Sequence, residues 1–402
     1  MGAWEYLEQL TAWPHRGSTS AYEAEAARWL AETLRSMGYA VAVEPFRAPA
    51  ATLYAGPPLV GAVVAAAVAV ALAAPGPWAT TVAAVVALGA VALLLQEALL
   101  LRPAFDRILP LRSSQNVVAV RPGATGTGPL VLVVAHYDTQ RGSWLFAPWF
   151  RRGLPVFFKL AYGGVALAVV GLLAGAVAGW LGTGWTTWRW VAAAGAALTV
   201  VTMGWLALAG WRGRPVNGAN DNGSGTAVVL ALAERWADRA SCPDVEVRFL
   251  LTGSEEVGTR GMWAYLDAHP ELKVRPVYVV NVDNVGGGSL RALRHEGMVL
   301  PVPCGRRLGR LVEALVQEGR LSWWDRMLLL STDAGPAAVR GHEVITFIGL
   351  DERGGIPHYH WFSDMIRHVD RDHLARVADT IGSFIDRLVS ELSEGTPSRP
   401  GV

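Results

Sequence analysis

Four long apolar stretches interrupt the alternation of hydrophobic and polar residues along this chain. They cover residues 59–74, 81–101, 154–181 and 190–211. As helices, they are about long enough to cross a hydrocarbon layer of ~30 Å. Burial in a large soluble core is the less favoured alternative, because soluble helices rarely stay apolar on all faces over such lengths. Short turns join the stretches in pairs, which predicts four transmembrane helices in two hairpins.

Tryptophan and arginine mark the ends of these stretches and indicate their orientation. Tryptophans gather where an interfacial belt is expected, at Trp78, Trp180, Trp185, Trp188, Trp190 and Trp211. The turns within the hairpins carry only Arg189 as a basic residue. The other flanks carry Arg47, Arg102, Arg107, Arg112, Arg151, Arg152, Arg212 and Arg214. Because basic flanks favour the cytoplasmic side, we expect a multi-pass membrane protein whose termini and hydrophilic remainder are cytoplasmic.

The hydrophilic remainder alternates between strand and helix patterns. Ser20-Ala-Tyr-Glu23 has the form of a capping box that opens a helix to about Met37. The solid apolar run 130–135 is typical of a strand covered on both faces. Further strands are expected at 41–46, 116–121, 245–251, 277–282 and 344–348. Further helices are expected at 223–239, 261–268, 307–318 and 371–392. This alternation predicts an α/β fold with a mostly parallel sheet between helical layers.

These patterns divide the chain into one hydrophilic domain with two inserted hairpins. The hairpins take residues 57–101 and 154–211, and residues 395–402 are expected to be a disordered tail. The hydrophilic domain takes residues 1–56, 102–153 and 212–394.

Composition narrows the function classes. The chain of 402 residues is 52% hydrophobic and 17% charged, which agrees with a membrane part. Its net charge of +1 gives no basis for a nucleic-acid partner. Cys242 and Cys304 lie far apart without CxxC spacing, which argues against a disulfide framework or a thiolate zinc site. Any metal must therefore be held by histidine and carboxylate. The N-terminus carries no basic segment typical of a signal peptide.

Acidic and imidazole side chains follow three of the predicted strands. His136 and Asp138 come after the strand at 130–135, Glu255 and Glu256 after 245–251, and Asp283 after 277–282. Each segment alone is more typical of a polar loop. Ligands of such sheets bind beyond the carboxyl ends of the strands, so we expect these side chains to converge.

Two further segments complete a metal-site pattern. Asp221 lies in a loop rich in glycine and asparagine, and His358-Tyr-His360 lies near the C-terminal helix. Two divalent ions ~3.5–4 Å apart need anionic ligands and ideally a bridging carboxylate. Histidine and carboxylate are what zinc accepts where no thiolate is available. The residues predict a metal-dependent hydrolase and leave the choice between His358 and His360 open.

This ordered series resembles metallopeptidase family 28, the di-zinc exopeptidases that include bacterial leucyl aminopeptidases. The resemblance covers Ser18 to about Asp386 without the hairpins. It implies a three-layer phosphorylase/hydrolase-like fold, cleavage of peptides at free N-termini, and two zinc ions, for which cobalt or manganese are alternatives. The implied metal ligands are His136, Asp221, Glu256, Asp283 and His360. In that assignment His136 shares one zinc with Glu256, Asp283 shares the other with the C-terminal histidine, and Asp221 bridges both.

The resemblance also assigns catalytic roles. Glu255 is implied as the general base, and Asp138 as the residue that orients His136. The closing pattern of the family aligns with Tyr359-His360-Trp361-Phe362-Ser363-Asp364, which selects His360 over His358. Ser331-Thr-Asp333 matches the family's Ser-Asp-His segment only loosely, so the substrate is less well defined than the metal site.

The place of the second hairpin bears on the substrate. Trp211 and Asp221 are separated by about ten residues, or at most ~35 Å of extended chain. We therefore expect the site near the bilayer and a peptide substrate that is apolar or released from the membrane, with a simple anchor as the alternative. Two other functions remain open: a membrane receptor or transporter that reuses a peptidase scaffold, and a di-zinc amidohydrolase of N-acyl amino acids.

Overall fold

The computed structural model divides the chain into two compact units, named here the sheet unit and the helical unit. The sheet unit consists of Met1–Ala50, Leu111–Arg141 and Pro215–Val402. The helical unit consists of Ala51–Pro110 and Gly142–Arg214. The residues that the structure describes are 1–121, 128–237, 244–327 and 330–394. The expected tail, 395–402, lies outside them.

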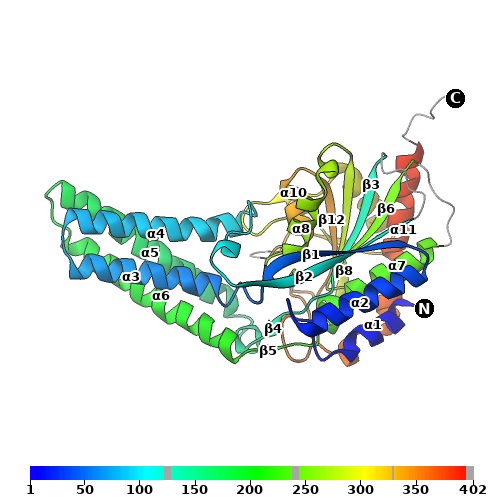
Figure 1. Ribbon diagram of the computed structural model, residues 1–402, viewed down its shortest axis with the longest axis horizontal. Helices are drawn as coiled ribbons and strands as arrows, with labels where there is room; N and C mark the ends of the chain where they lie inside the picture. The colour runs from blue at the N-terminus through cyan, green and yellow to red at the C-terminus, as the bar shows by residue number, and fades with distance from the viewer. Residues whose placement is uncertain (122–127, 238–243, 328–329, 395–402) are drawn as a thin grey trace. The chain divides into compact units, whose positions relative to one another are not determined.

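An eight-stranded mixed sheet forms the centre of the sheet unit (Figure 1). Its strand order is β1-β2-β6-β3-β7-β12-β8-β11. The bounds are β1 (Ala40–Pro49), β2 (Leu111–Val120), β3 (Leu130–His136), β6 (Glu246–Thr252), β7 (Val277–Asp283), β8 (Ser289–Leu293), β11 (Ser322–Trp324) and β12 (Glu343–Leu350). The central strands β6, β3, β7 and β12 run parallel. The pairs β1–β2, β2–β6 and β12–β8 are antiparallel, and β11 runs parallel to β8. The predicted mixed, mostly parallel sheet is confirmed.

Helices cover both faces of this sheet. In β3, Val131 and Val133 pack into the larger core, whereas Leu132 and Val134 pack into the smaller core on the opposite face. This alternation within a continuous apolar run is expected for a strand buried on both sides. The larger core contains α1 (Ala3–Ala12), α2 (Ala21–Ser36), α7 (Gly225–Ala237), α9 (Arg306–Gln317) and α11 (Arg371–Glu394). The smaller core contains α8 (Arg260–Ala268) and α10 (Ala334–Val339).

Short elements complete the chain. The two-residue strands are β4 (Arg141–Gly142), β5 (Arg214–Pro215), β9 (His295–Glu296) and β10 (Val302–Pro303). Single helical turns are η1 (Phe105–Arg107), η2 (Trp144–Phe146), η4 (Pro270–Lys273) and η5 (Ile366–His368).

The helical unit is a bundle of the four expected apolar helices (Figure 1). They are α3 (Gly56–Ala73), α4 (Pro77–Ala98), α5 (Leu154–Trp180) and α6 (Thr186–Arg212). Three of them have proline in their first turn, at Pro57, Pro77 and Pro155, where the missing N–H costs no hydrogen bond. By length and composition, all four could cross a membrane.

Glycine brings α5 and α6 together. A Cβ atom at Gly171 would lie 2.4 Å from the backbone nitrogen of Ala192, and one at Gly195 would lie 2.3 Å from that of Ala168. Neither position has room for a side chain, so both glycines permit the close backbone approach that is common between membrane helices.

Candidate metal centre

The residues predicted as metal ligands and base line one pocket of the sheet unit. They are His136, Asp221, Glu255, Glu256, Asp283 and His360. Asp138 is fully buried beside them, with its Oδ1 atom 3.5 Å from Nδ1 of His136. His358 lies outside this pocket, where its Nδ1 atom is 2.7 Å from Oγ of Ser363. The structure thus brings His360 rather than His358 to the site.

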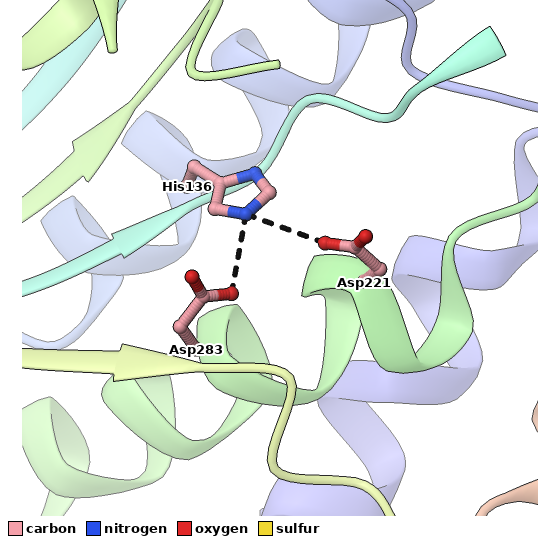
Figure 2. A group of neighbouring side chains, drawn as sticks. All are labelled: His136, Asp221 and Asp283. Carbon is pink, nitrogen blue, oxygen red and sulfur yellow. Dashed lines mark ion pairs between the residues drawn. The ribbon is translucent and has the colours of Figure 1, made fainter. Parts of the chain in front are cut away.

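Strand order explains how the first residues meet. His136 is the last residue of β3 and Asp283 the last residue of β7. These strands are parallel neighbours, so their carboxyl ends present both side chains at one edge of the sheet. Figure 2 shows the two side chains facing each other, with Asp221 approaching from a different segment.

Asp221 is held in an irregular turn, η3 (Ala219–Ser224), which leads into α7. The carboxylate of Asp364 accepts the backbone N–H groups of Asn220 at 2.6 Å and Asp221 at 3.0 Å. Gly218, before this turn, has φ +68, and a Cβ atom there would lie 2.3 Å from Cγ2 of Thr139. The turn therefore requires glycine at position 218, just before it, and the buried Asp364 carboxylate as acceptor for its backbone N–H groups.

Two groups of ligand atoms share Asp221. In the first, Nε2 of His136 lies 3.5 Å from Oδ1 of Asp221 and 3.4 Å from Oδ1 of Asp283 (Figure 2). In the second, Nε2 of His360 lies 3.2 Å from Oδ2 of Asp221 and 3.0 Å from Oε2 of Glu256. Asp221 therefore places one carboxylate oxygen in each group.

This grouping corrects the pairing expected from the resemblance. His136 is grouped with Asp283, and Glu256 is grouped with His360. The structure does not group the expected partners, His136 with Glu256 and Asp283 with His360. The reason is the sheet: β3 and β7 end side by side, whereas Glu256 lies four residues beyond the end of β6 on a loop that reaches toward His360.

The geometry and chemistry of both groups fit zinc. Two ligand atoms bound at about 2.0–2.1 Å to a tetrahedral zinc ion lie about 3.3 Å apart. The separations around His136 are 3.4 and 3.5 Å, and those around His360 are 3.0 and 3.2 Å. The second carboxylate oxygen of Glu256, Oε1, is buried and accepts no hydrogen bond. An unsatisfied buried carboxylate oxygen beside imidazole nitrogens is what a cation would satisfy.

The pKa values of the pocket residues also favour a cation site. Burial and the charge of Asp221 raise the pKa of Glu256 to about 7. Burial raises the pKa of Glu255 well above its usual value, although the charge of His136 opposes this rise. Burial lowers the pKa of His360, but the charge of Glu256 and hydrogen bonds to Asp221 and Glu256 raise it to about 9. Both the acids and the imidazole therefore hold protons more strongly than they do in water. This indicates that the pocket carries excess negative charge, which bound cations would neutralise.

Asp138 links the imidazole to the glutamate loop. One carboxylate oxygen of Asp138 accepts the backbone N–H of Glu255 at 2.8 Å, and the other accepts that of Glu256 at 3.2 Å. The Nδ1 atom of His136 also lies 3.3 Å from the backbone oxygen of Asp138. Oε2 of Glu255 lies 3.9 Å from Nε2 of His136, so this carboxylate stands next to the first ligand group.

Arg16 is a supporting residue that the sequence did not reveal. Its side chain is fully buried, and its guanidinium donates hydrogen bonds to four backbone carbonyls. These carbonyls belong to Leu10, Tyr137, Asn217 and Gly218. Arg16 thus ties the loop of His136 to the loop of Asp221. In the sequence it is a lone arginine between predicted elements, where exposure is the usual expectation.

The fold and this buried cluster define the sheet unit as an α/β domain with a candidate metal centre at the carboxyl ends of its parallel strands. Residues 201–385 match the sequence model of peptidase family M28. This match agrees with the resemblance seen in the motifs of the chain.

The chain is also similar to individual proteins in sequence or in fold. The chain is similar to aminopeptidase YwaD of Bacillus subtilis, with 29% identity over 187 residues, which are 43% of this chain and 38% of YwaD. Its fold is similar to that of BSAP, a zinc aminopeptidase from Bacillus subtilis, with a TM-score of 0.54 and 16% identity over 96% of this chain and 94% of BSAP. It is also similar to that of Porphyromonas gingivalis glutaminyl cyclase, with a TM-score of 0.56 and 14% identity over 96% and 97% of the two chains.

Proposed function

We propose that this protein is a membrane-anchored di-zinc aminopeptidase that hydrolyses peptide bonds at free N-termini. The observation that carries the proposal is the division of the Asp221 carboxylate between two buried ligand groups. A bridging carboxylate is the feature that two neighbouring cations need. The match to peptidase family M28 and the similarity to aminopeptidase YwaD support the reaction class.

Each residue of the site then has a role. His136, Asp221 and Asp283 would hold one zinc ion, and Asp221, Glu256 and His360 the other. When bound, the two ions would polarise the scissile carbonyl and lower the pKa of the attacking water.

Glu255 lines the pocket without belonging to either ligand group, which suits a general base. It takes the proton of the attacking water and passes it to the leaving amine. Asp138 fixes the backbone of Glu255 and the ring of His136, so it acts by positioning both.

The pocket has two chemically different parts that favour an N-terminal apolar residue. Its acidic part contains Glu255, Glu256 and Asp283 and would attract a free α-amine. Its remaining wall is largely apolar and is formed by Met327, Leu330, Ile348, Ile356 and Tyr359. A peptide with a small or medium apolar side chain at its N-terminus matches both parts.

The four apolar helices support a place in the cell membrane as a multi-pass protein. The arginines outside the hairpin turns favour a cytoplasmic sheet unit. The substrates proposed on this basis are apolar peptides at the cytoplasmic side of the bilayer, including peptides released from it. A cysteine introduced at Thr183, in the turn between α5 and α6, should react with an impermeant thiol reagent from outside intact cells; protection there contradicts this orientation.

Metal content and N-terminal specificity test the enzymatic proposal together. The purified chain in detergent should bind two equivalents of zinc and release leucine from a leucyl amide. Chelation should abolish the release, and added zinc should restore it. N-acetylation of the same substrate should block turnover, whereas an N-acyl amidohydrolase would prefer the acetylated form.

Glu255→Gln tests the assigned base. It should retain zinc and lose on the order of 100-fold or more in kcat, and Glu352→Gln, an exposed charge-matched control, should resemble the wild type. A zinc-loaded Glu255→Gln variant with wild-type turnover would remove Glu255 from its role.

A further inference from the structure

Glu23 is a buried acid that the assigned mechanism does not use. It lies in the first turn of α2, and its side chain is 1% exposed. The N-cap residue Ser20 accepts the backbone N–H of Glu23, as in a capping box. The carboxylate of Glu23, however, accepts the N–H of Thr19 with only one of its oxygens, Oε2, at 2.7 Å. The other oxygen is directed into the protein.

That inner oxygen reaches the loop that carries the proposed base. Oε1 of Glu23 accepts the backbone N–H of Ser254 at 3.1 Å and the hydroxyl of Ser254 at 3.2 Å. It also accepts the hydroxyl of Ser114, on β2, at 2.9 Å. Since Ser254 directly precedes Glu255, Glu23 holds the residue next to the proposed base.

Two carboxylates therefore hold three successive backbone amides. Glu23 accepts the N–H of Ser254, and Asp138 accepts those of Glu255 and Glu256. The loop is thus fixed from α2 on one side and from the end of β3 on the other. Both carboxylates are buried, so water does not compete for these hydrogen bonds.

Ser254 needs such support because its backbone is unfavourable. Its φ is +54, a left-handed conformation that favours glycine, and its side chain is fully buried. Its hydroxyl also lies 2.9 Å from that of Ser114 and 2.7 Å from that of Ser18. Without Glu23, the backbone of Ser254 would lose its acceptor and could relax toward a common conformation, which would turn Glu255 away from the pocket.

We propose that Glu23 is a positioning residue for Glu255, which it holds toward the metal centre through Ser254. This inference rests on the proposed function of Glu255 as general base. It does not make Glu23 a catalytic residue, because Glu23 touches neither the pocket nor a metal ligand.

Hydrogen exchange of the zinc-free protein tests the contact without any activity. Glu23→Met keeps the length of the side chain and removes both oxygens that accept hydrogen bonds, whereas glutamine would keep one acceptor for Ser254. Exchange of the amides at 254–256 should become on the order of tenfold faster. The matched control is Glu32→Met, an exposed position of the same helix with the same substitution, which should leave these amides unchanged. Equal protection in Glu23→Met and the wild type overturns the proposal.

Kinetics of the zinc-loaded protein test the consequence. Glu23→Met should lower kcat about 10–100-fold with little change in KM and with full zinc content. In a Glu255→Gln background, the same substitution should cause no further loss, because its effect passes through Glu255. Additive losses, or loss of zinc, would assign Glu23 a general structural role and overturn the proposal.

These experiments separate the inference from the function on which it rests. An inactive wild type would defeat the proposed function, whereas an active wild type with an equally active Glu23→Met would defeat only the role of Glu23. Should Glu23→Met fail to fold, Ser254→Ala is the second variant. It removes the hydroxyl contacts with Glu23, Ser18 and Ser114 and leaves the backbone amide. A smaller fall in kcat is therefore expected, and wild-type kcat in Ser254→Ala would contradict the proposal.

Discussion

Pairs of ligand substitutions can decide which residues share a zinc ion. His136 and Asp283 belong to one group of the structure, and His136 and Glu256 to different groups. The double variant His136→Ala/Asp283→Asn should therefore lose one ion and keep the other. The double variant His136→Ala/Glu256→Gln should lose both. The pairing implied by the resemblance predicts the opposite result for each variant.

The expected weakening follows from the number of ligands. Structural zinc sites with four protein ligands bind with about 10–16 kcal/mol, or roughly 3 kcal/mol for each ligand. Each group here offers three protein ligand atoms, one imidazole nitrogen and two carboxylate oxygens. The imidazole nitrogen lies 3.0–3.5 Å from the carboxylate oxygens of its group. Removal of one ligand should weaken its own ion on the order of 100-fold, and removal of two from the same group on the order of 10,000-fold.

Zinc content measured by elemental analysis is the assay. Each variant is equilibrated in a metal buffer at a free zinc concentration that just saturates the wild type. His358→Ala serves as the control, because His358 lies outside the pocket and bonds to Ser363, and it should keep both ions. The grouping derived from the sheet would be refuted if His136→Ala/Glu256→Gln retained one ion and His136→Ala/Asp283→Asn retained none.

Two further predictions concern buried charges away from the ligands. Arg16→Met should remove four buried hydrogen bonds at a cost of about 4 kcal/mol, which lowers the Tm of the sheet unit by about 8–16 °C. The exposed control Arg28→Met should leave the Tm unchanged, and equal Tm values for the two variants would contradict the role of Arg16. Burial raises the pKa of Glu296 from 4.5 to about 7, so the folded state binds this proton more tightly than the unfolded state and stability falls as pH rises between these values. The Tm of Glu296→Gln, measured at steps from pH 5 to pH 8, should therefore rise relative to the wild type, and a constant difference would contradict the shift.

The sequence predicted the elements that depend on local pattern. The apolar run of β3 and the four apolar helices were recognisable because burial on both faces, or in lipid, leaves a continuous hydrophobic signal. The strands β8 and β11 were missed. They are five and three residues long and lie at one edge of the sheet, and Arg291 interrupts the apolar residues of β8. Short edge strands carry too few alternating positions to stand out.

The site was predictable as a set of residues but not as a geometry. His136 and Asp283 directly follow predicted strands and Asp221 precedes a predicted helix, and the order of the motifs along the chain carried the family resemblance. The pairing of His136 with Asp283 depends on β3 and β7 being neighbours, and strand order is a property of the whole sheet. Arg16 and Glu23 support the site through contacts more than 100 residues away in sequence, which no local pattern encodes.

The two insertions leave this geometry intact because each begins and ends at adjacent points of the sheet unit. The first leaves after Pro49 and returns at Leu111, and these residues are direct partners in the antiparallel pair of β1 and β2. The second leaves after Gln140 and returns before Val216, whose N–H donates to the carbonyl of Gln140 at 3.1 Å. A segment whose ends are neighbours can be replaced by a much longer one without moving the flanking structure.

The second insertion follows Asp138 and precedes Asp221, so it separates two parts of the metal centre in sequence. Within the sheet unit, the hydrogen bond between Gln140 and Val216 and the contacts of Arg16 with both loops bring these parts back together. The ligand geometry is therefore fixed by the sheet unit itself. The second hairpin therefore adds apolar helices at a point where the metal centre requires only that two chain ends stay side by side.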